Sequence, residues 1–417
     1  MIVVPLKHAC PPLFILGLIA LITACSGGSS GDGQADIPIL VDLLTLEATI
    51  EDDPTLDDFQ IVSPRGIGVD AVGNIYLADE YSVKVYGPDG SPLKTIGREG
   101  AGPGEFNAAF TANIGPTGCI AAMDILWEAN IYAPDGEFLH RSRYRNEDPF
   151  REHIQASGFT FTMMREVVAL DSERLLIDLF ALNSTLPGPF VGNLQLICAT
   201  TNSLGIVCSY TDYESIKLTE NNNTSVVFQG DLIWSIIDAD HLLFTHTSVD
   251  RVEDGDNSCY NLIVLDLETS ATDTLMVPWL PETIPPEVKT KEPEHNEFLN
   301  ITFEVEPVVR EIMNDTRYYP PLKDLKTDHG LIFGFHFSPT DSFDRDFEED
   351  DLEVEAHLVD IIDIVSGRLL ARAEFPFLPE VIRDGRAYRL FTPQDDFSAV
   401  HVYQIDPRIY ALRDEHD

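Results

Sequence analysis

The chain has 417 residues, of which 44% are hydrophobic, enough for one large domain or two smaller ones. It carries 70 acidic against 27 basic residues, a formal net charge of −43. This balance argues against nucleic-acid binding, which needs clustered Lys and Arg, and against docking on anionic lipid. We expect a solvated acidic coat that keeps the protein soluble; an acidic surface that binds cations is the alternative.

Residues 1–24 have the composition of a secretory signal peptide. The apolar run Leu13–Thr23 is too short to span a bilayer, and it leads into Leu21-Ile22-Thr23-Ala24-Cys25, which resembles a lipobox. In bacterial lipoproteins with this motif the chain is cut before the cysteine, whose thiol is then diacylated. We expect residues 25–38 to be a flexible tether after lipidated Cys25. Ser26, directly after the cysteine, suits sorting of the lipoprotein to the outer membrane. The alternative to a lipoprotein signal is an ordinary signal peptide with an incidental cysteine.

Short β-segments separated by turns occupy residues 64–106. Apolar residues recur in segments of three to six residues, and Gly, Pro, Asp and Asn stand between the segments. This pattern predicts a four-stranded antiparallel meander. Such a meander cannot bury both of its faces alone, so we expect similar meanders beside it.

The same stretch resembles a known repeat. The run P-x-G-I-x-V-D-x-x-G-N-I-Y-x-A-D begins at Pro64, and V-Y-x-x-D-G and G-x-x-G-x-G-P-G-E-F follow it. These motifs are similar to the NHL repeat, one blade of the six-bladed β-propellers common in bacterial lipoproteins and secreted proteins. The resemblance implies the fold. It leaves the function open, because these families include binding scaffolds, sensor domains, and a few lyases and lactonases.

Comparable groups of β-segments continue along the chain. We expect four-stranded groups within 112–144, 167–210, 234–277 and 322–375, and a three-stranded group within 381–405. A spare β-like segment, Ile39–Ile50, precedes the first group and can supply the missing outer strand. The sequence therefore predicts an all-β, six-bladed propeller over residues 39–410, with its last blade closed by the N-terminal strand and a tail at 411–417.

The connections between strands differ in length on the two faces of such a propeller. The first-to-second and third-to-fourth strand turns share one face, here named the tight-turn face, and the other connections share the long-loop face. Long connections fall on the latter, at 146–152, 181–192, 250–257, 278–321 and 338–352, with a short helix expected at 304–313. Because long loops in compact domains are usually functional or disordered, we expect a protein or small-molecule ligand on the long-loop face.

Histidines and carboxylates occupy matching positions near the ends of second strands. They are Asp79, Asp124, His246 and His336, with Asp178 one place earlier in its blade. Imidazole and carboxylate suit a divalent metal such as zinc or calcium, or general acid–base work. The alternative is that the aspartates cap their own loops by hydrogen bonding and that the histidines line the rim.

Two acidic loops offer hard oxygen ligands of the kind that calcium prefers. They are Asp250–Asn257 and Asp341–Asp351. Neither reproduces the spacing of an EF-hand, and solvated acidic loops are the alternative.

Cysteine usage is compatible with an oxidising compartment. Cys198 and Cys208 each lie five residues from Ser203, so a hairpin turning there would place them across two strands as a candidate disulfide. Two buried thiols are the alternative. Cys119 and Cys259 have no obvious partner, and no C-x-x-C motif suggests a structural zinc site.

Taken together, these features predict a binding module of the bacterial cell envelope, attached to the outer membrane by its N-terminal lipid alone. No later apolar run reaches the roughly 18 residues of a membrane-spanning helix. The alternative is a metal-dependent hydrolase or lyase, resembling lactonases or amidating lyases, with calcium or zinc on the central axis. No complete ligand set for that ion can be assigned from the sequence.

Overall fold

The computed structural model describes residues 37–414 except 52–54, 143–149, 151, 154–155, 157–160, 183–189, 201–202, 220–221, 226–229, 287–288, 290–313, 339–355 and 392–397. Residues 39–417 form one compact unit, which is described here by itself. The expected signal peptide, Cys25, most of the tether and the helix expected at 304–313 lie outside the described residues.

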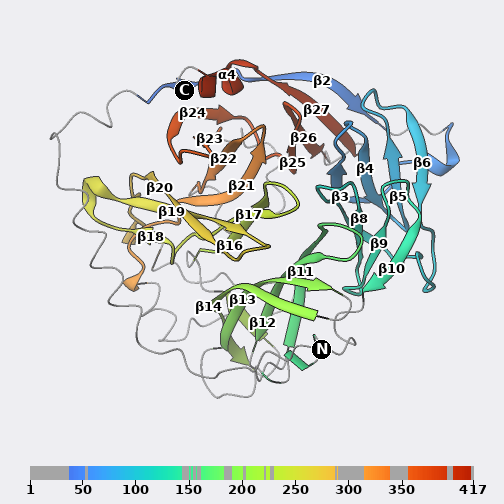
Figure 1. The fold of residues 1–417 in the computed structure, drawn as a ribbon, viewed down its shortest axis with the longest axis horizontal. Helices are drawn as coiled ribbons and strands as arrows, with labels where there is room; N and C mark the ends of the chain where they lie inside the picture. The colour runs from blue at the N-terminus through green and yellow to red at the C-terminus, as the bar shows by residue number, and fades with distance from the viewer. Residues whose placement is uncertain are drawn as a thin grey trace. The chain divides into compact units, whose positions relative to one another are not determined.

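Six antiparallel sheets follow one another along the chain (Figure 1). Blade one contains β3 (Pro64–Val69), β4 (Ile75–Asp79), β5 (Ser82–Tyr86) and β6 (Pro92–Ile96). Blade two contains β7 (Ala109–Ile114), β8 (Ile120–Asp124), β9 (Ala129–Tyr132) and β10 (Phe138–Ser142). Blade three contains β11 (Phe161–Ala169), β12 (Leu175–Leu182), β13 (Phe190–Thr200), β14 (Ser203–Thr219) and a short fifth strand, β15 (Asn222–Ser225).

The remaining blades repeat this order. Blade four contains β16 (Leu232–Ile236), β17 (His241–His246), β19 (Cys259–Asp266) and β20 (Thr272–Pro278), with the short β18 (Arg251–Val252) beside β19. Blade five contains β21 (Leu322–Asp328), β22 (Leu331–His336), β23 (His357–Asp363) and β24 (Leu369–Phe375). Blade six contains β25 (Val381–Arg383), β26 (Arg386–Phe391), β27 (Ala399–Ile405) and β2 (Leu44–Ile50).

The hydrophobic core shows how the blades are joined. Each of six buried clusters draws its side chains from two successive blades, and the sixth joins blade six back to blade one. A sheet packed on both faces needs apolar residues on both, which explains why β4 and β8 are buried at every position. The unit is therefore a six-bladed β-propeller, as the sequence predicts.

Ring closure by the N-terminal segment is also confirmed. β2 pairs antiparallel with β27, so the outer strand of blade six comes from the start of the domain. An additional contact was not expected: β1 (Ile39–Leu40) pairs in parallel with β24 of blade five. Leu43, between β1 and β2, is buried in the cluster that joins blades five and six. The N-terminal segment thus fastens two blades.

A C-terminal helix was not expected from the sequence. α4 (Arg408–Asp414) buries Ile409 in the same cluster between blades five and six. The hydroxyl of Tyr410 donates to Asp328 Oδ2 at 2.7 Å, and Arg413 Nε lies 3.0 Å from Asp363 Oδ1. Within the described part of the chain, no helix is long and apolar enough to cross a membrane.

The closing strand offers a test of this architecture. Ile50 is 4% exposed and packs between blades six and one, whereas Leu46 on the same strand is 51% exposed. We expect Ile50→Ala to lower the free energy of unfolding by about 2–4 kcal/mol, because it leaves a cavity in the closing contact. Leu46→Ala should change it by about 0.5 kcal/mol or less. Denaturant titration measures both, and equal effects would contradict closure through this strand.

Candidate functional site

The two aspartates of the predicted ring hold the links that enter their blades. Asp79, at the end of β4, is fully buried and accepts hydrogen bonds from the backbone N–H groups of Val62 and Ser63 at 3.0 and 2.6 Å. It also lies 2.6 Å from Nζ of Lys84, which bonds the carbonyl of Gln60. This buried carboxylate therefore fixes the segment ahead of blade one with both of its oxygens.

Asp124 repeats the arrangement in blade two. Its carboxylate accepts from the backbone N–H groups of Asn107 at 2.6 Å and Leu126 at 2.7 Å, and from the Asn107 side chain at 3.2 Å. The predicted alternative, an aspartate that caps its own loop, describes Asp124 through Leu126, whereas the backbone N–H groups bonded by Asp79 belong to the preceding link. Asp178, in blade three, is bonded instead by the indole N–H of Trp234 at 3.0 Å. Its burial raises its pKa to about 6, although Arg165 opposes this shift.

His246 has its own set of contacts. It is 2% exposed at the end of β17, its Nδ1 accepts from the backbone N–H of Ser248 at 3.3 Å, and its ring lies 5.0 Å from that of Tyr210. Asp250 receives hydrogen bonds from the His246 backbone N–H at 2.8 Å and from the Tyr210 hydroxyl at 2.7 Å. The first acidic loop is therefore anchored by its first residue. The second acidic loop, at 341–351, lies outside the described residues.

His336 belongs to a buried cluster around Asp360. Its Nε2 lies 3.0 Å from Asp360 Oδ2, which also accepts from the Tyr260 hydroxyl at 2.7 Å. Arg372 Nε donates to the other oxygen at 3.1 Å. Burial acts to raise the pKa of Asp360, but the charge and hydrogen bond of His336, with Tyr260 and Arg372, outweigh it and lower that pKa. Since Tyr260 comes from blade four, this cluster ties blades four and five together.

The four predicted site residues thus occupy equivalent strand ends, each with a different set of partners. Across the described residues, no group of three or more His, Cys, Asp or Glu side chains is arranged to hold a metal ion. Binding of zinc or calcium remains a prediction for the four residues Asp79, Asp124, His246 and His336. The structure shows that each of them also has protein partners of its own.

The expected cysteine pair is not bonded in the structure. β13 and β14 do form a hairpin, but Thr200 pairs with Ser203, so the chain turns before Ser203 and not around it. Cys198 therefore lies opposite Gly205, and Cys208 lies opposite Leu196. Cys198 and Cys208 are free thiols that pack against one core cluster. Cys119 and Cys259 are also free thiols. Burial raises the pKa of the Cys208 thiol to about 12.

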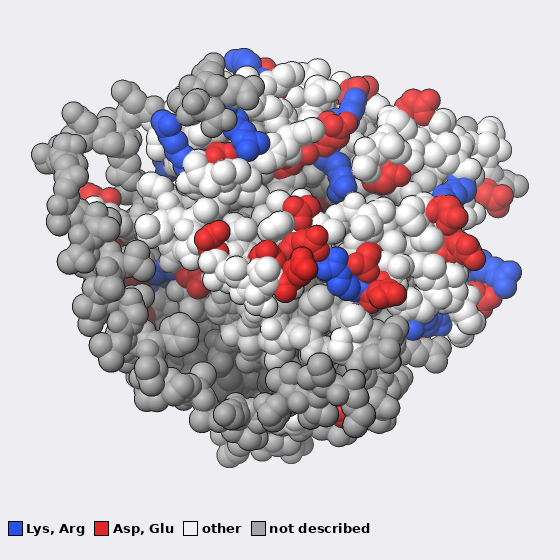
Figure 2. All heavy atoms as spheres, viewed as in Figure 1, with Lys and Arg blue, Asp and Glu red and all other residues white. Residues whose placement is uncertain are grey.

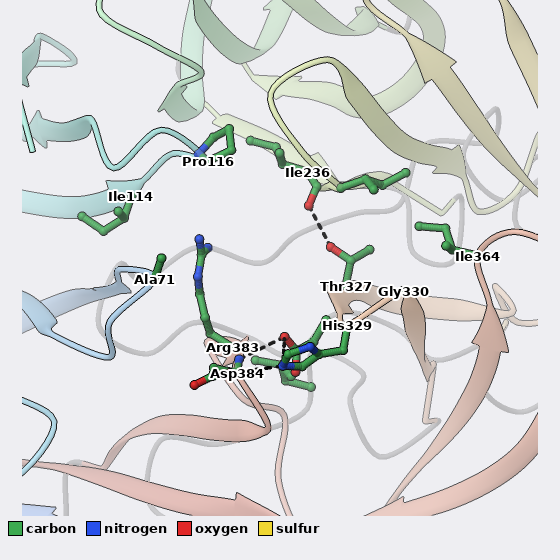
Figure 3. A pocket seen from close by; sticks show the side chains of 13 residues that line it. Ala71, Ile114, Pro116, Ile236, Thr327, His329, Gly330, Ile364, Arg383 and Asp384 are labelled. Carbon is green, nitrogen blue, oxygen red and sulfur yellow. Dashed lines mark hydrogen bonds and ion pairs between the residues drawn. The ribbon is translucent and has the colours of Figure 1, made fainter. Parts of the chain in front are cut away.

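A cavity that the sequence did not indicate lies where first strands end at the tight-turn face. Its volume is about 300 Å³. Turns or strand ends from blades one, two, four, five and six converge on it, and the isoleucines that form its apolar wall are Ile114, Ile236, Ile237, Ile364 and Ile382. Figure 3 shows the guanidinium of Arg383 extending from the end of β25 into the space between Ala71 and Thr327.

Two tight turns supply the other charged groups of the cavity. His329-Gly330 and Asp384-Gly385 are two-residue loops in which both residues have positive φ, as in type I′ hairpin turns. Asp and Gly are usual there, but His is not, and this unusual turn residue is the one signal by which the sequence could have indicated the cavity. The described part of the face drawn in Figure 2 carries Asp and Glu side chains with Lys and Arg among them.

Further charges lie on first strands. Glu166 of β11 and Lys326 of β21 attract each other, and Lys326 Nζ also lies 2.7 Å from Asp324 Oδ2. Loss of hydration raises the pKa of Glu166 to about 7, against the attraction of Lys326. Burial by itself acts to lower the pKa of Lys326, but Asp324, Glu166 and Glu380 outweigh it and raise that pKa.

The raised pKa of Glu166 gives a pH-dependent prediction. Between its unfolded value, about 4.3, and about 7, the folded state binds the proton more tightly, so this group's stabilising contribution is lost as pH rises. We expect Glu166→Gln to stabilise the protein by about 2 kcal/mol more at pH 8 than at pH 4.5. Chemical unfolding at several pH values measures this difference. The exposed neighbour variant Glu173→Gln should show none, and parallel curves for Glu166→Gln and wild type would contradict the assignment.

Comparisons with known proteins find only remote structural likenesses. No protein-family model matches the chain, and no curated protein matches it. Similar solved structures include a Bacteroides fragilis protein described as exported (13% identity, 89% of this chain and 99% of that one, TM-score 0.41). A Bacteroides caccae protein of unknown function has 14% identity over 75% and 81% of the two chains, with a TM-score of 0.34. A Xanthomonas campestris gluconolactonase has 10% identity over 90% and 99%, with a TM-score of 0.40.

Proposed function

We propose that this protein is a lipid-anchored β-propeller of the bacterial cell envelope that binds a small molecule in the cavity at its tight-turn face. The observation that carries the proposal is the cavity itself. Five isoleucines from four blades surround a space of about 300 Å³. Small-molecule sites are typically concave, with apolar walls and a few placed polar groups. This cavity combines its isoleucine wall with polar groups from Thr327, His329 and Arg383.

The cavity lies on the face opposite to the one expected from loop length. The long-loop face stays a prediction for a protein partner, because most of its longest connections fall outside the described residues. Among the described ones, Ile125 and Leu126 are 42% and 55% exposed in the turn between β8 and β9. Apolar residues at the tip of a turn support the idea of a partner on that face.

A metal-dependent hydrolase or lyase with a site on the central axis remains the alternative function. It differs from the binding proposal in requiring a stoichiometric ion. Elemental analysis of the purified chain, with and without prior chelation, separates the two. Calcium or zinc at one equivalent, with turnover of a lactone lost on chelation, would favour the enzyme.

Binding in the cavity can be tested by filling it. Ala71 lines the cavity, whereas its neighbour Val72 is 73% exposed and does not. We expect ligand-observed NMR with a library of neutral, anionic and cationic fragments to give hits that compete with one another. Ala71→Phe should abolish these hits, because its ring occupies their space, and Val72→Phe should retain them. Hits that survive Ala71→Phe would place binding elsewhere, and an absence of hits would contradict the function.

The proposed anchor has a separate test. In the natural host, Cys25→Ala should move the protein from the membrane fraction to the soluble fraction, because the acyl chains are its proposed attachment. Incorporation of labelled palmitate should be lost at the same time. Membrane association of the variant equal to that of wild type would contradict lipid anchoring through Cys25.

A further inference from the structure

The acidic groups around the cavity are already occupied by protein partners. Asp328 accepts hydrogen bonds from the backbone N–H groups of Asp384 and Gly385 at 3.0 and 2.9 Å. It accepts a third from the Tyr410 hydroxyl at 2.7 Å. The Asp328 carboxylate therefore binds the turn of blade six and the C-terminal helix. It is not directed at a ligand.

The histidine of the cavity is also paired. His329 Nε2 lies 3.2 Å from Asp384 Oδ1, and Asp384 Oδ2 lies 3.8 Å from Nη1 of Arg386. The Thr327 hydroxyl donates to the carbonyl of Ile236 at 2.8 Å (Figure 3). These contacts connect blades four, five and six at the rim and leave the polar groups that make them satisfied.

Arg383 differs from all of these groups. It is half-buried, and among the described residues its guanidinium makes no hydrogen bond, ion pair or cation–π interaction. Its guanidinium instead points into the cavity, among apolar side chains. A partly desolvated cation without a partner is unfavourable. In a chain with 70 acidic residues, a carboxylate partner would be easy to supply, so this guanidinium is suited to an anion from outside the chain.

We propose that the cavity binds a small monocarboxylate, its carboxylate on the Arg383 guanidinium and its apolar body against the isoleucine wall. This assignment rests on the proposed function and names its ligand class. A guanidinium presents two parallel N–H donors that match a carboxylate. The wall disfavours strongly hydrated bodies such as sugars. The net charge of −43 disfavours anions that carry more than one charge.

The size of the cavity limits the body of the ligand. A volume of about 300 Å³ equals that of about ten water molecules in the liquid, so a molecule of roughly ten non-hydrogen atoms fills it. Hexanoate and cyclohexanecarboxylate, with about eight and nine such atoms, are suitable probes. Hexan-1-ol matches the body of hexanoate without its charge, and hexyl phosphate matches it with a higher charge.

Calorimetric titration of the full-length protein at pH 7.5 with these probes tests the proposal. We expect hexanoate to bind at least about 10-fold more tightly than hexan-1-ol, the order of a single charge-assisted contact. Arg383→Met should weaken hexanoate binding by a similar factor and leave hexan-1-ol unchanged. The affinity of Arg383→Lys for hexanoate should fall between those of wild type and Arg383→Met, because lysine keeps the positive charge but lacks the two parallel N–H donors. The exposed-residue control Arg98→Met should behave as wild type.

The outcomes separate this inference from the function on which it rests. If hexanoate and hexan-1-ol bind equally, the carboxylate assignment is overturned and small-molecule binding stands. If hexyl phosphate binds more tightly than hexanoate, the class is a phosphate ester and the monocarboxylate proposal fails. If no probe binds to wild type, both proposals fail. Thermal melts of Arg383→Met show whether that variant is folded, so loss of binding cannot be confused with loss of structure.

Discussion

Every sheet in this protein is covered on both faces by its neighbours, and the rest of the structure depends on that constraint. A blade at either end of an open series would expose one apolar face, so an open series of blades is unfavourable. The ring resolves this by packing blade six on blade one, where Ile50 and Val400 meet Ile67 and Leu77 in one cluster. The N-terminal strand completes the last blade, which removes the open edge that a three-stranded blade would present.

Burial on both faces also governs the polar residues. A connection that enters a blade brings backbone N–H groups to a buried place, and these need acceptors. Asp79 and Asp124 supply them in blades one and two. In blade five, Asp360 serves between blades, where it receives bonds from Tyr260 and Arg372. Asp79 and Asp124, which resemble metal ligands in the sequence, thus bind backbone N–H groups and hold the connections between blades in place.

The tight-turn face combines short, well-bonded turns with Arg383, whose guanidinium makes no hydrogen bond or ion pair among the described residues. Its turns are two residues long at His329-Gly330 and Asp384-Gly385, and Asp328 bonds the second of these turns to the first strand of blade five. A cavity walled by such short connections changes little in shape. A preformed site of this kind loses little entropy when it orders a ligand, which favours binding by a small cavity. Arg383 is held in that frame by its place at the end of β25.

The sequence by itself determined the class of fold, the strands and the composite last blade. These follow from local information: period-two apolar runs, Gly and Asp turns, and a missing outer strand beside the spare segment at 39–50. It also identified the equivalent positions of Asp79, Asp124, His246 and His336, because equal spacing from a turn gives equal places in a blade. The short pairing of β1 with blade five and the helix α4 carried no comparable pattern, since two residues and seven residues are too few to show a period.

Only the tertiary structure decided what the polar side chains do. Asp360 is bonded by Tyr260, 100 positions away in another blade, and the cavity around Arg383 is built from several blades. No local sequence pattern encodes such long-range contacts. The register that separates Cys198 from Cys208 is likewise a property of the paired strands, because spacing alone cannot reveal at which residue a hairpin turns. The cavity is the clearest case: Ile114, Ile236 and Ile382 become neighbours only when the ring closes, because ring closure alone brings the ends of their strands together.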